Sequence, residues 1–320
     1  MKKILLAIMS LAMACGIGVA AVGCGGNGSD SIVVIGREAS SGTREAFDKA
    51  VVNAEGESLD DYSSSQNPDE EEHAGYVSGA IYLGGTGDVA SRVASTKDAI
   101  GYISLGSVDE SVKDLKIEGV EATESNVLDG KYAIQRPFVV MKRDASKGEL
   151  QGLAADFYSF LTSEEAQGYM EEAGVISLTD TDLRDGQEVT QYTALSAKPA
   201  TGDKIVIRGS TSMTDTINIM IREYVELNSG WCTNEMFDLQ LQGSSYGRDA
   251  VDGDTTCNII GLASSSEAES DTRDHFNIAL DAVAVIVNPD NELSDITLEQ
   301  LYDIYTGAIT TWSELTGTEA

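Results

Sequence analysis

Histidine is scarce in this sequence: only His73 and His275 occur, together with four cysteines. So few and so scattered imidazoles and thiols build neither a Cys/His metal cluster nor a Ser-His-Asp triad, and most hydrolase mechanisms lose their general base. Basic residues are also few, 21 against 53 acidic ones, for a formal net charge of -32. Such a surface repels nucleic acid and anionic lipid. We expect no metal, no cofactor, no nucleic-acid partner and no enzymatic activity.

Apolar residues are nevertheless abundant. The 320 residues are 42% hydrophobic, which allows a sizeable core and more than one domain. Apolar runs with strand character alternate with helical patterns, which favours an α/β architecture. The expected strands cover 32–35, 204–207 and 282–287. One helix is expected to begin at Thr43, and others are expected to cover 150–161, 217–225 and 297–305. A capping box is expected at 162–165. Residues 56–73 are expected to be a surface loop, and 179–203 a linker.

The N-terminus has the pattern of an export signal. Lys2 and Lys3 precede an apolar run over 4–14 that is too short to span a bilayer, and small residues follow up to Cys24. This pattern predicts a lipoprotein signal peptide at 1–23, a lipid on Cys24 and a tether over 24–31, so that the protein is anchored outside the cytoplasmic membrane. The alternative is a plain secretory peptide without the lipid.

Two cysteines remain in the body of the chain. Cys232 and Cys257 each precede an apolar strand-like run, over 237–242 and 259–263 respectively. In an exported protein they could form a disulfide if these strands were neighbours. Two unpaired thiols are the equally weighted alternative.

Four segments share one design, a strand followed by a turn rich in Gly, Ser and Thr and then a helix. They cover 35–44, 209–213, 243–247 and 261–266. The first N–H groups of a helix lack internal partners and carry partial positive charge, so such turns suit an anion, whereas a single one can simply be a helix cap. Arg37 adds a planar fork of donors, worth about 1.5–3 kcal/mol per charge-assisted hydrogen bond. Alternatively, Arg37 only pairs with Glu38 or Glu45.

Several longer motifs resemble a known family. They are REASSGTREAF at 37–47, AIGYISLG at 99–106, YAIQRPFVV at 132–140, GSTS at 209–212, AVAVIVNP at 282–289 and DIYTG at 303–307. Together they resemble the phosphate-binding proteins of bacterial phosphate ABC transporters, over nearly all of the chain after the signal peptide. The resemblance implies a monomer that captures inorganic phosphate and delivers it to a membrane permease. Other uses of the fold would be binding of sulfate or molybdate, phosphate sensing, or hydrolysis of a phosphate ester.

The order of the motifs differs from the family's. Residues 203–320 resemble the family's first part and 32–178 resemble the remainder, so that the chain is expected to be circularly permuted, with 179–203 joining the old ends. Permutation is tolerated where termini lie together on the surface. A rearranged gene is the alternative explanation.

The resemblance also implies a two-lobe periplasmic-binding-protein fold of type II. Lobe A would contain 135–285, including the linker, and lobe B would contain 31–134 and 286–320, with crossing strands at 132–141 and 282–288. The implied phosphate ligands are Thr211, Ser212, Ser244 and Ser264 on lobe A, and Arg37, Ser41, Gly42 and Thr43 on lobe B. Some members have an aspartate at the position of Ser264, where it accepts the proton of the bound phosphate; an uncharged serine weakens the expected discrimination against sulfate.

Overall fold

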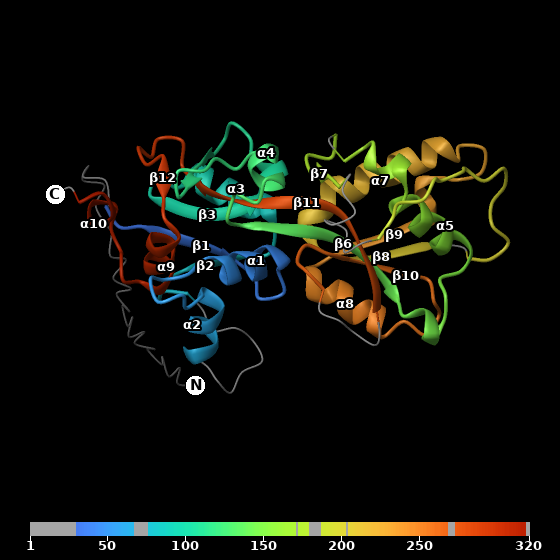
Figure 1. The fold of residues 1–320 in the computed structure, drawn as a ribbon, viewed down its shortest axis with the longest axis horizontal. Coiled ribbons are helices and arrows are strands. Elements are labelled where there is room, and N and C mark those ends of the chain that lie inside the picture. Colours follow the sequence, from blue (N-terminus) through green and yellow to red (C-terminus); the bar gives the residue numbers. More distant parts are fainter. Residues whose placement is uncertain are drawn as a thin grey trace, which may run out of the picture.

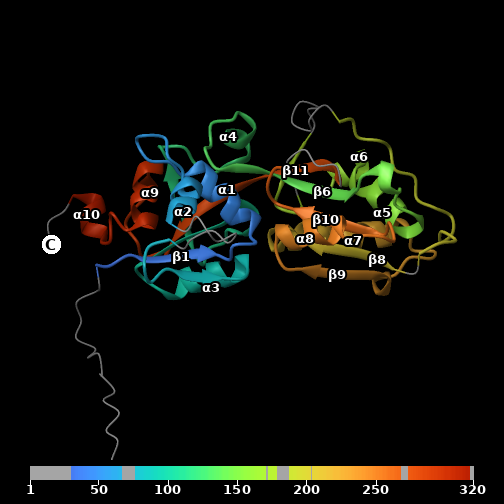
Figure 2. The ribbon, with the colours of Figure 1, turned by 90° about the horizontal axis from the view of Figure 1, so that it is seen from below.

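The computed structural model describes residues 30–66, 76–170, 172–178, 187–202, 204–267 and 273–317. The signal peptide, Cys24 and His73 lie outside these residues. Figures 1 and 2 both show two bodies side by side, with β6 and β11 running between them. The body that holds β1, β2 and β3 is lobe B, and the body that holds β8, β9 and β10 is lobe A.

One sheet runs through both lobes. Its strands, in spatial order, are β2 (Ile81–Leu83), β1 (Val33–Arg37), β3 (Ala99–Ser104), β11 (Arg273–Val287), β6 (Gln135–Arg143), β10 (Ile259–Ala263), β8 (Ile205–Gly209) and β9 (Phe237–Leu241). The short strands β4 (Lys113–Asp114) and β7 (Ile176–Ser177) also pair with β11, and β5 (Lys116–Ile117) pairs with β12 (Asp295–Ile296). Strands β1, β2 and β3 are parallel to one another, as are β8, β9 and β10, whereas β11 is antiparallel to both β3 and β6.

Helices cover both faces of this sheet. Lobe B contains α1 (Gly42–Ala50), α2 (Leu59–Gln66), α3 (Thr86–Ser95), α4 (Glu124–Leu128), α9 (Leu298–Thr306) and α10 (Trp312–Thr316). Lobe A contains α5 (Gly152–Leu161), α6 (Glu164–Gln167), α7 (Thr214–Leu227) and α8 (Ser244–Asp252). Successive β6 side chains alternate between two buried clusters, Phe138 and Val140 in one, Val139 and Met141 in the other, as a strand buried on both faces requires. None of the described helices has the length and apolar character needed to cross a membrane.

The crossing strands connect the lobes by a change of partner within β11. Ala282 pairs with Gln135 of β6, and the next residue, Val283, pairs with Ser104 of β3. Strand β11 therefore leaves lobe A and enters lobe B at this point. It begins at Arg273, nine residues before the expected start of this strand at 282, because 273–281 pair along β6.

Two expected boundaries are wrong. The expected loop at 56–73 contains α2, which buries Leu59 and Ser63 against the rest of lobe B despite its polar composition. The capping box expected at 162–165 is not formed. Thr162 ends α5, and the Ser163 hydroxyl alone caps α6 by accepting from the N–H of Ala166, whose methyl group cannot complete a box. The capping box of α9 lies where the sequence predicts it, at 297–300.

Cys232 and Cys257 are both free in the structure. The strands that follow them, β9 and β10, are not neighbours, because β8 lies between them. Cys232 is packed in the core of lobe A, and burial raises the pKa of its thiol to about 11. It therefore remains protonated at neutral pH and is a poor nucleophile.

The two ends of the described chain lie together on lobe B. Ser31 forms an antiparallel bridge with Thr311, and the N–H of Ile32 donates to the carbonyl of Thr310 at 2.8 Å. On the other side, the N–H of Trp312 donates to the carbonyl of Asp30 at 2.9 Å. Residues from the beginning and the end of the chain thus share one short piece of backbone pairing.

Candidate functional site

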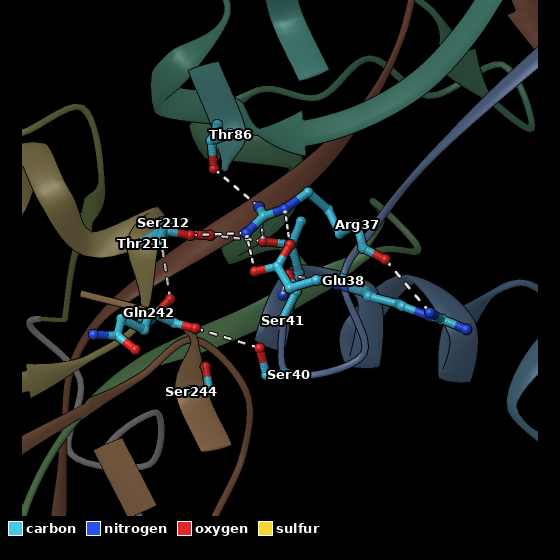
Figure 3. Close-up of polar contacts among 12 residues, drawn as sticks. Arg37, Glu38, Ser40, Ser41, Thr86, Thr211, Ser212, Gln242 and Ser244 are labelled. Atoms are coloured by element: carbon cyan, nitrogen blue, oxygen red, sulfur yellow. Dashed lines mark hydrogen bonds and ion pairs between the residues drawn. The ribbon is translucent and has the colours of Figure 1, made fainter. Parts of the chain in front are cut away.

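Arg37 is the central residue of the site. It is the last residue of β1 and is fully buried. Its Nε and Nη2 donate to the two carboxylate oxygens of Glu38, each at 2.9 Å, while Nη2 also donates to Thr211 Oγ1 of lobe A at 2.7 Å (Figure 3). Nη1 donates to Thr43 and Thr86 at 3.3 and 3.1 Å. Arg37 therefore pairs with Glu38, as one alternative expects, and not with Glu45, and it also reaches across to lobe A.

A buried network holds the backbone of Arg37. Its N–H donates to the Tyr102 hydroxyl at 3.2 Å, and its carbonyl accepts from Nη1 of Arg44 at 3.4 Å. Asp48 accepts from both Arg44 Nε, at 3.1 Å, and the Tyr76 hydroxyl, at 2.5 Å. Burial, reinforced by the negative charge of Asp48, raises the pKa of Tyr76 well above its ordinary value. Tyr76 therefore stays a proton donor, and the end of β1 is rigidly placed.

The turn after β1 brings the first turn of α1 to the same point. Ser41 is the N-cap of α1, and its hydroxyl accepts from the N–H groups of Thr43 and Arg44. Thr43 Oγ1 and Ser212 Oγ, which belong to different lobes, are 2.6 Å apart. Hydroxyls of the two lobes are therefore in direct contact at the N-terminus of α1.

Lobe A contributes three similar turns. Thr211 and Ser212 lie in a short 3-10 turn (Thr211–Met213) before α7, Ser244 is the first residue of α8, and Ser264 follows β10 directly. The N–H of Ser264 donates to Ser244 Oγ at 3.1 Å, and the hydroxyls of Ser210 and Ser264 are 2.7 Å apart. All these turns lie at the carboxyl ends of parallel strands, where open α/β sheets bind ligands.

Gly42 lies where lobe B comes closest to these serines. A Cβ on Gly42 would lie 2.4 Å from Ser244 Oγ, 2.6 Å from Ser264 Oγ and 3.1 Å from the carbonyl carbon of Ser264. The absence of a side chain therefore allows the two lobes to meet. The structure thus brings all eight predicted ligands together: Arg37, Ser41, Gly42, Thr43, Thr211, Ser212, Ser244 and Ser264.

We predict that Gly42→Ala weakens anion binding without unfolding the protein, because the methyl group strains only the contact between lobes. Overpacking of this kind costs about 1–3 kcal/mol, or roughly ten- to hundredfold in affinity. Isothermal titration calorimetry measures the loss. Gly84→Ala is the matched control in lobe B, since an added methyl there meets nothing within 4 Å. Equal affinities of the two variants would contradict the prediction.

Thr86 also contacts Arg37, although it is not among the eight predicted ligands. It is the first residue of α3, is almost fully buried, and accepts from Arg37 Nη1 (Figure 3). The signal was present: Gly84 and Gly85 followed by Thr86 repeat the strand, Gly/Ser/Thr turn and helix design of the four predicted segments. A cleft of about 500 Å³ between the lobes is lined by Thr86, Thr211 and Ser212 among others and leads from the surface to these residues.

An ion pair in the crossing strands, Arg136 with Asp281, also reaches the site. Arg136 Nε and Nη2 donate to one oxygen of Asp281 at 3.1 and 2.8 Å, and both side chains are 1% exposed. The third nitrogen, Nη1, donates to Ser264 Oγ at 3.2 Å, while Ser104 donates to Asp281 at 2.8 Å. Burial raises the pKa of Asp281 against the attraction of Arg136. The pair links the crossing strands to a serine of the site.

The site is chemically a set of hydrogen-bond donors. Its hydroxyls and helix N-termini surround the guanidinium of Arg37, and Glu38 is the carboxylate that contacts this guanidinium directly. The guanidinium of Arg136 reaches the site through Ser264. Within the described residues, no group of three or more His, Cys, Asp or Glu side chains could hold a metal ion. Donors arranged in this way can bind a small anion between two lobes.

Comparisons with known proteins agree with this geometry. A family model described as a PBP superfamily domain matches residues 25–165 and 194–320. "Phosphate-binding protein PstS 2" of Streptococcus pneumoniae is 33% identical over 90% of this chain and 88% of its own, and "Phosphate-binding protein PstS 2" of Streptococcus agalactiae is 31% identical over 98% and 99%. The crystal structure of a phosphate-binding protein of a phosphate ABC transporter from Streptococcus pneumoniae has a TM-score of 0.63 at 32% identity, covering 89% of this chain and 99% of its own.

Two α/β lobes with an anion-binding geometry between them, together with the matched model, define a member of the PBP superfamily. The two streptococcal relatives identify the family within this superfamily. The chain belongs to the family of PstS-like phosphate-binding proteins.

Proposed function

We propose that the chain binds inorganic phosphate between its lobes and delivers it, chemically unchanged, to the permease of a phosphate ABC transporter. The observation that carries the proposal is Arg37, a fully buried guanidinium at the end of β1 that already contacts Thr211 of the other lobe. Phosphate would take hydrogen bonds from Arg37 and from the hydroxyls and N–H groups of the predicted ligands. The relatives are phosphate-binding transport proteins, and the protein is not an enzyme.

One observation favours a second candidate function, the binding of another tetrahedral oxyanion in place of phosphate. Ser264 Oγ accepts from Arg136, so this serine is best placed to donate its own proton to an anion rather than to accept one. A site without an acceptor at this position discriminates less between hydrogen phosphate and an unprotonated anion such as sulfate or molybdate. Glu38 is the remaining acceptor, and both of its carboxylate oxygens are bound by Arg37.

Calorimetric titration of the purified protein tests both candidates. We expect tight binding of phosphate and weaker binding of sulfate and molybdate, measured at several pH values. Binding of sulfate in preference to phosphate would support the second candidate, and binding of none of these anions would refute the proposal.

We also propose that the protein is exported and held outside the cytoplasmic membrane by a lipid on Cys24. The supporting evidence is the pattern of the first residues, and Cys24 itself lies outside the described residues. We predict that Cys24→Ser moves the protein from the membrane fraction to the medium or periplasm, because the lipid attaches to the thiol. Fractionation and immunoblotting measure this, with Cys232→Ser as the control. An unchanged distribution of Cys24→Ser would refute the anchor.

Finally, we propose that the chain is a circular permutant whose lobes close on the anion by a hinge motion in β6 and β11. The expected lobes are 135–285 and 31–134 with 286–320, and the change of partner in β11 moves their common boundary to Ala282 and Val283. The pairing of Ser31 with Thr311 supports the permutation, because it puts the two ends of the described chain where a cut and rejoining need them. The streptococcal relatives match nearly end to end, which favours an inherited order over a rearrangement of this gene alone.

A further inference from the structure

Glu45 connects the two lobes outside the anion site. It lies in the first turn of α1 in lobe B, and its Oε2 accepts from two groups of lobe A. Ser265 Oγ donates to it at 2.7 Å, and Arg248 Nη1 donates at 3.2 Å. Its other oxygen, Oε1, accepts from Lys49 of the same helix at 2.9 Å. One carboxylate thus has partners in both lobes, and those in lobe A are reached only when the lobes are in contact.

Arg248 is held in place by lobe A itself. It lies in α8, where its Nε donates to Glu267 at 2.7 Å and its Nη2 to Ser265 Oγ at 2.6 Å. The Glu267 side chain is 1% exposed and also faces Arg273 at 3.3 Å. The guanidinium is therefore oriented toward lobe B before Glu45 arrives, so that little conformational entropy is lost when the pair forms.

The surroundings of the pair favour its charged form. Burial alone would raise the pKa of Glu45, but Arg248, Lys49 and Ser265 together lower it below its ordinary value. Likewise, burial would lower the pKa of Arg248, and the attraction of Glu267 and Glu45 raises it. Both side chains are partly exposed, 25% and 19%, beside a cleft of about 300 Å³ lined by Glu45, Lys49 and Ser265. The pair is therefore ionised at neutral pH and accessible to salt.

We propose that Glu45, Arg248 and Ser265 form a latch between the lobes that sets the affinity for the anion without contacting it. This inference rests on the proposed function. Contacts made only when the lobes are together stabilise the closed state alone, and a ligand that needs that state binds more tightly by the same factor. Residues of the latch are therefore positioning residues for the proposed phosphate site.

A double-mutant cycle on the full-length protein in detergent tests the latch. The variants are Glu45→Gln, Arg248→Met and the double variant, each titrated with inorganic phosphate, sulfate and molybdate at low and at high salt. We expect each single variant to bind roughly fivefold more weakly and the double variant to bind no more weakly than the worse single one. At high salt the difference from the wild type should shrink, since salt screens the pair.

Lys49→Met is the matched control. Lys49 binds the same carboxylate, but from the same helix, so its loss does not distinguish closed from open lobes and should leave affinity within about twofold of the wild type. Glu45→Gln preserves the shape of a half-buried side chain and so tests the latch even where Arg248→Met does not fold. Unchanged affinity of Glu45→Gln, or effects that add in the double variant, would overturn the latch. Failure of the wild type to bind any of the three anions would instead overturn the proposed function.

Discussion

Arg37→Ala is expected to abolish tight phosphate binding. To bind the anion, the fork of Arg37 would redirect N–H groups that now contact Thr43, Thr86 and Thr211. The variant loses at least two charge-assisted hydrogen bonds of about 1.5–3 kcal/mol each, less the threonine contacts that the anion replaces, so that binding weakens by about a hundredfold. Arg37→Lys keeps the charge but cannot hold Glu38 with two nitrogens and reach Thr211 at once, and we expect an intermediate affinity. Calorimetric titration with phosphate measures both variants.

The control is an arginine near the end of another parallel strand. Arg208 of β8 is paired with Asp238 outside the site, and Arg208→Ala should bind phosphate as the wild type does. Folding of Arg37→Ala is checked by thermal unfolding, since the substitution also leaves Glu38 unpaired. Glu38 is 24% exposed and can be hydrated, so the protein should remain folded at the temperature of the titration. Wild-type affinity in a folded Arg37→Ala variant would exclude Arg37 from the site.

The largest effect on stability is expected from the ion pair of the crossing strands. Arg136→Met leaves the fully buried carboxylate of Asp281 without its cation, which costs about 3–5 kcal/mol of the free energy of unfolding. The double variant Arg136→Met with Asp281→Leu removes both charges, and a well-packed apolar pair is often neutral or better than the ions it replaces. We therefore expect the double variant to recover most of the lost stability.

Urea unfolding followed by circular dichroism measures these differences. The partly exposed pair of Arg273 with Asp252 supplies the comparison, because Asp252→Asn there should cost at most about 1 kcal/mol. A double variant as unstable as Arg136→Met alone would show that the loss comes from packing rather than from an unpaired charge.

Local sequence patterns predict much of this site because its elements are local. A strand, a glycine-containing turn and the N-terminus of a helix are encoded within about ten residues, and each such unit presents its donors at the carboxyl end of its strand. The meeting of the turns at 37–43 and 209–212, however, came from the family resemblance. The sequence does not identify Thr86 as a site residue, because only the fold brings its turn, which has the same design, to Arg37.

The charged contacts between distant segments could not be predicted in the same way. Glu45 and Arg248 are 203 positions apart, and the sequence offers only Arg37 as a partner for Glu45 and none for Arg248. The sequence does give a signal for Arg136 and Asp281, because each lies beside apolar strand residues, where a buried charge needs a partner. Pairing the two requires the register of β6 against β11, which a single sequence does not encode locally.

The backbone pairing of Asp30 and Ser31 with 311–312 determines which half of the molecule a lipid on Cys24 would hold. The chain emerging from the bilayer would meet lobe B first and be fastened there, six positions before Arg37. A force on the lipid anchor would then act on lobe B alone, and the crossing strands would bear none of it. Lobe A, at the end of the molecule far from the membrane attachment, would be the lobe that moves in the hinge motion.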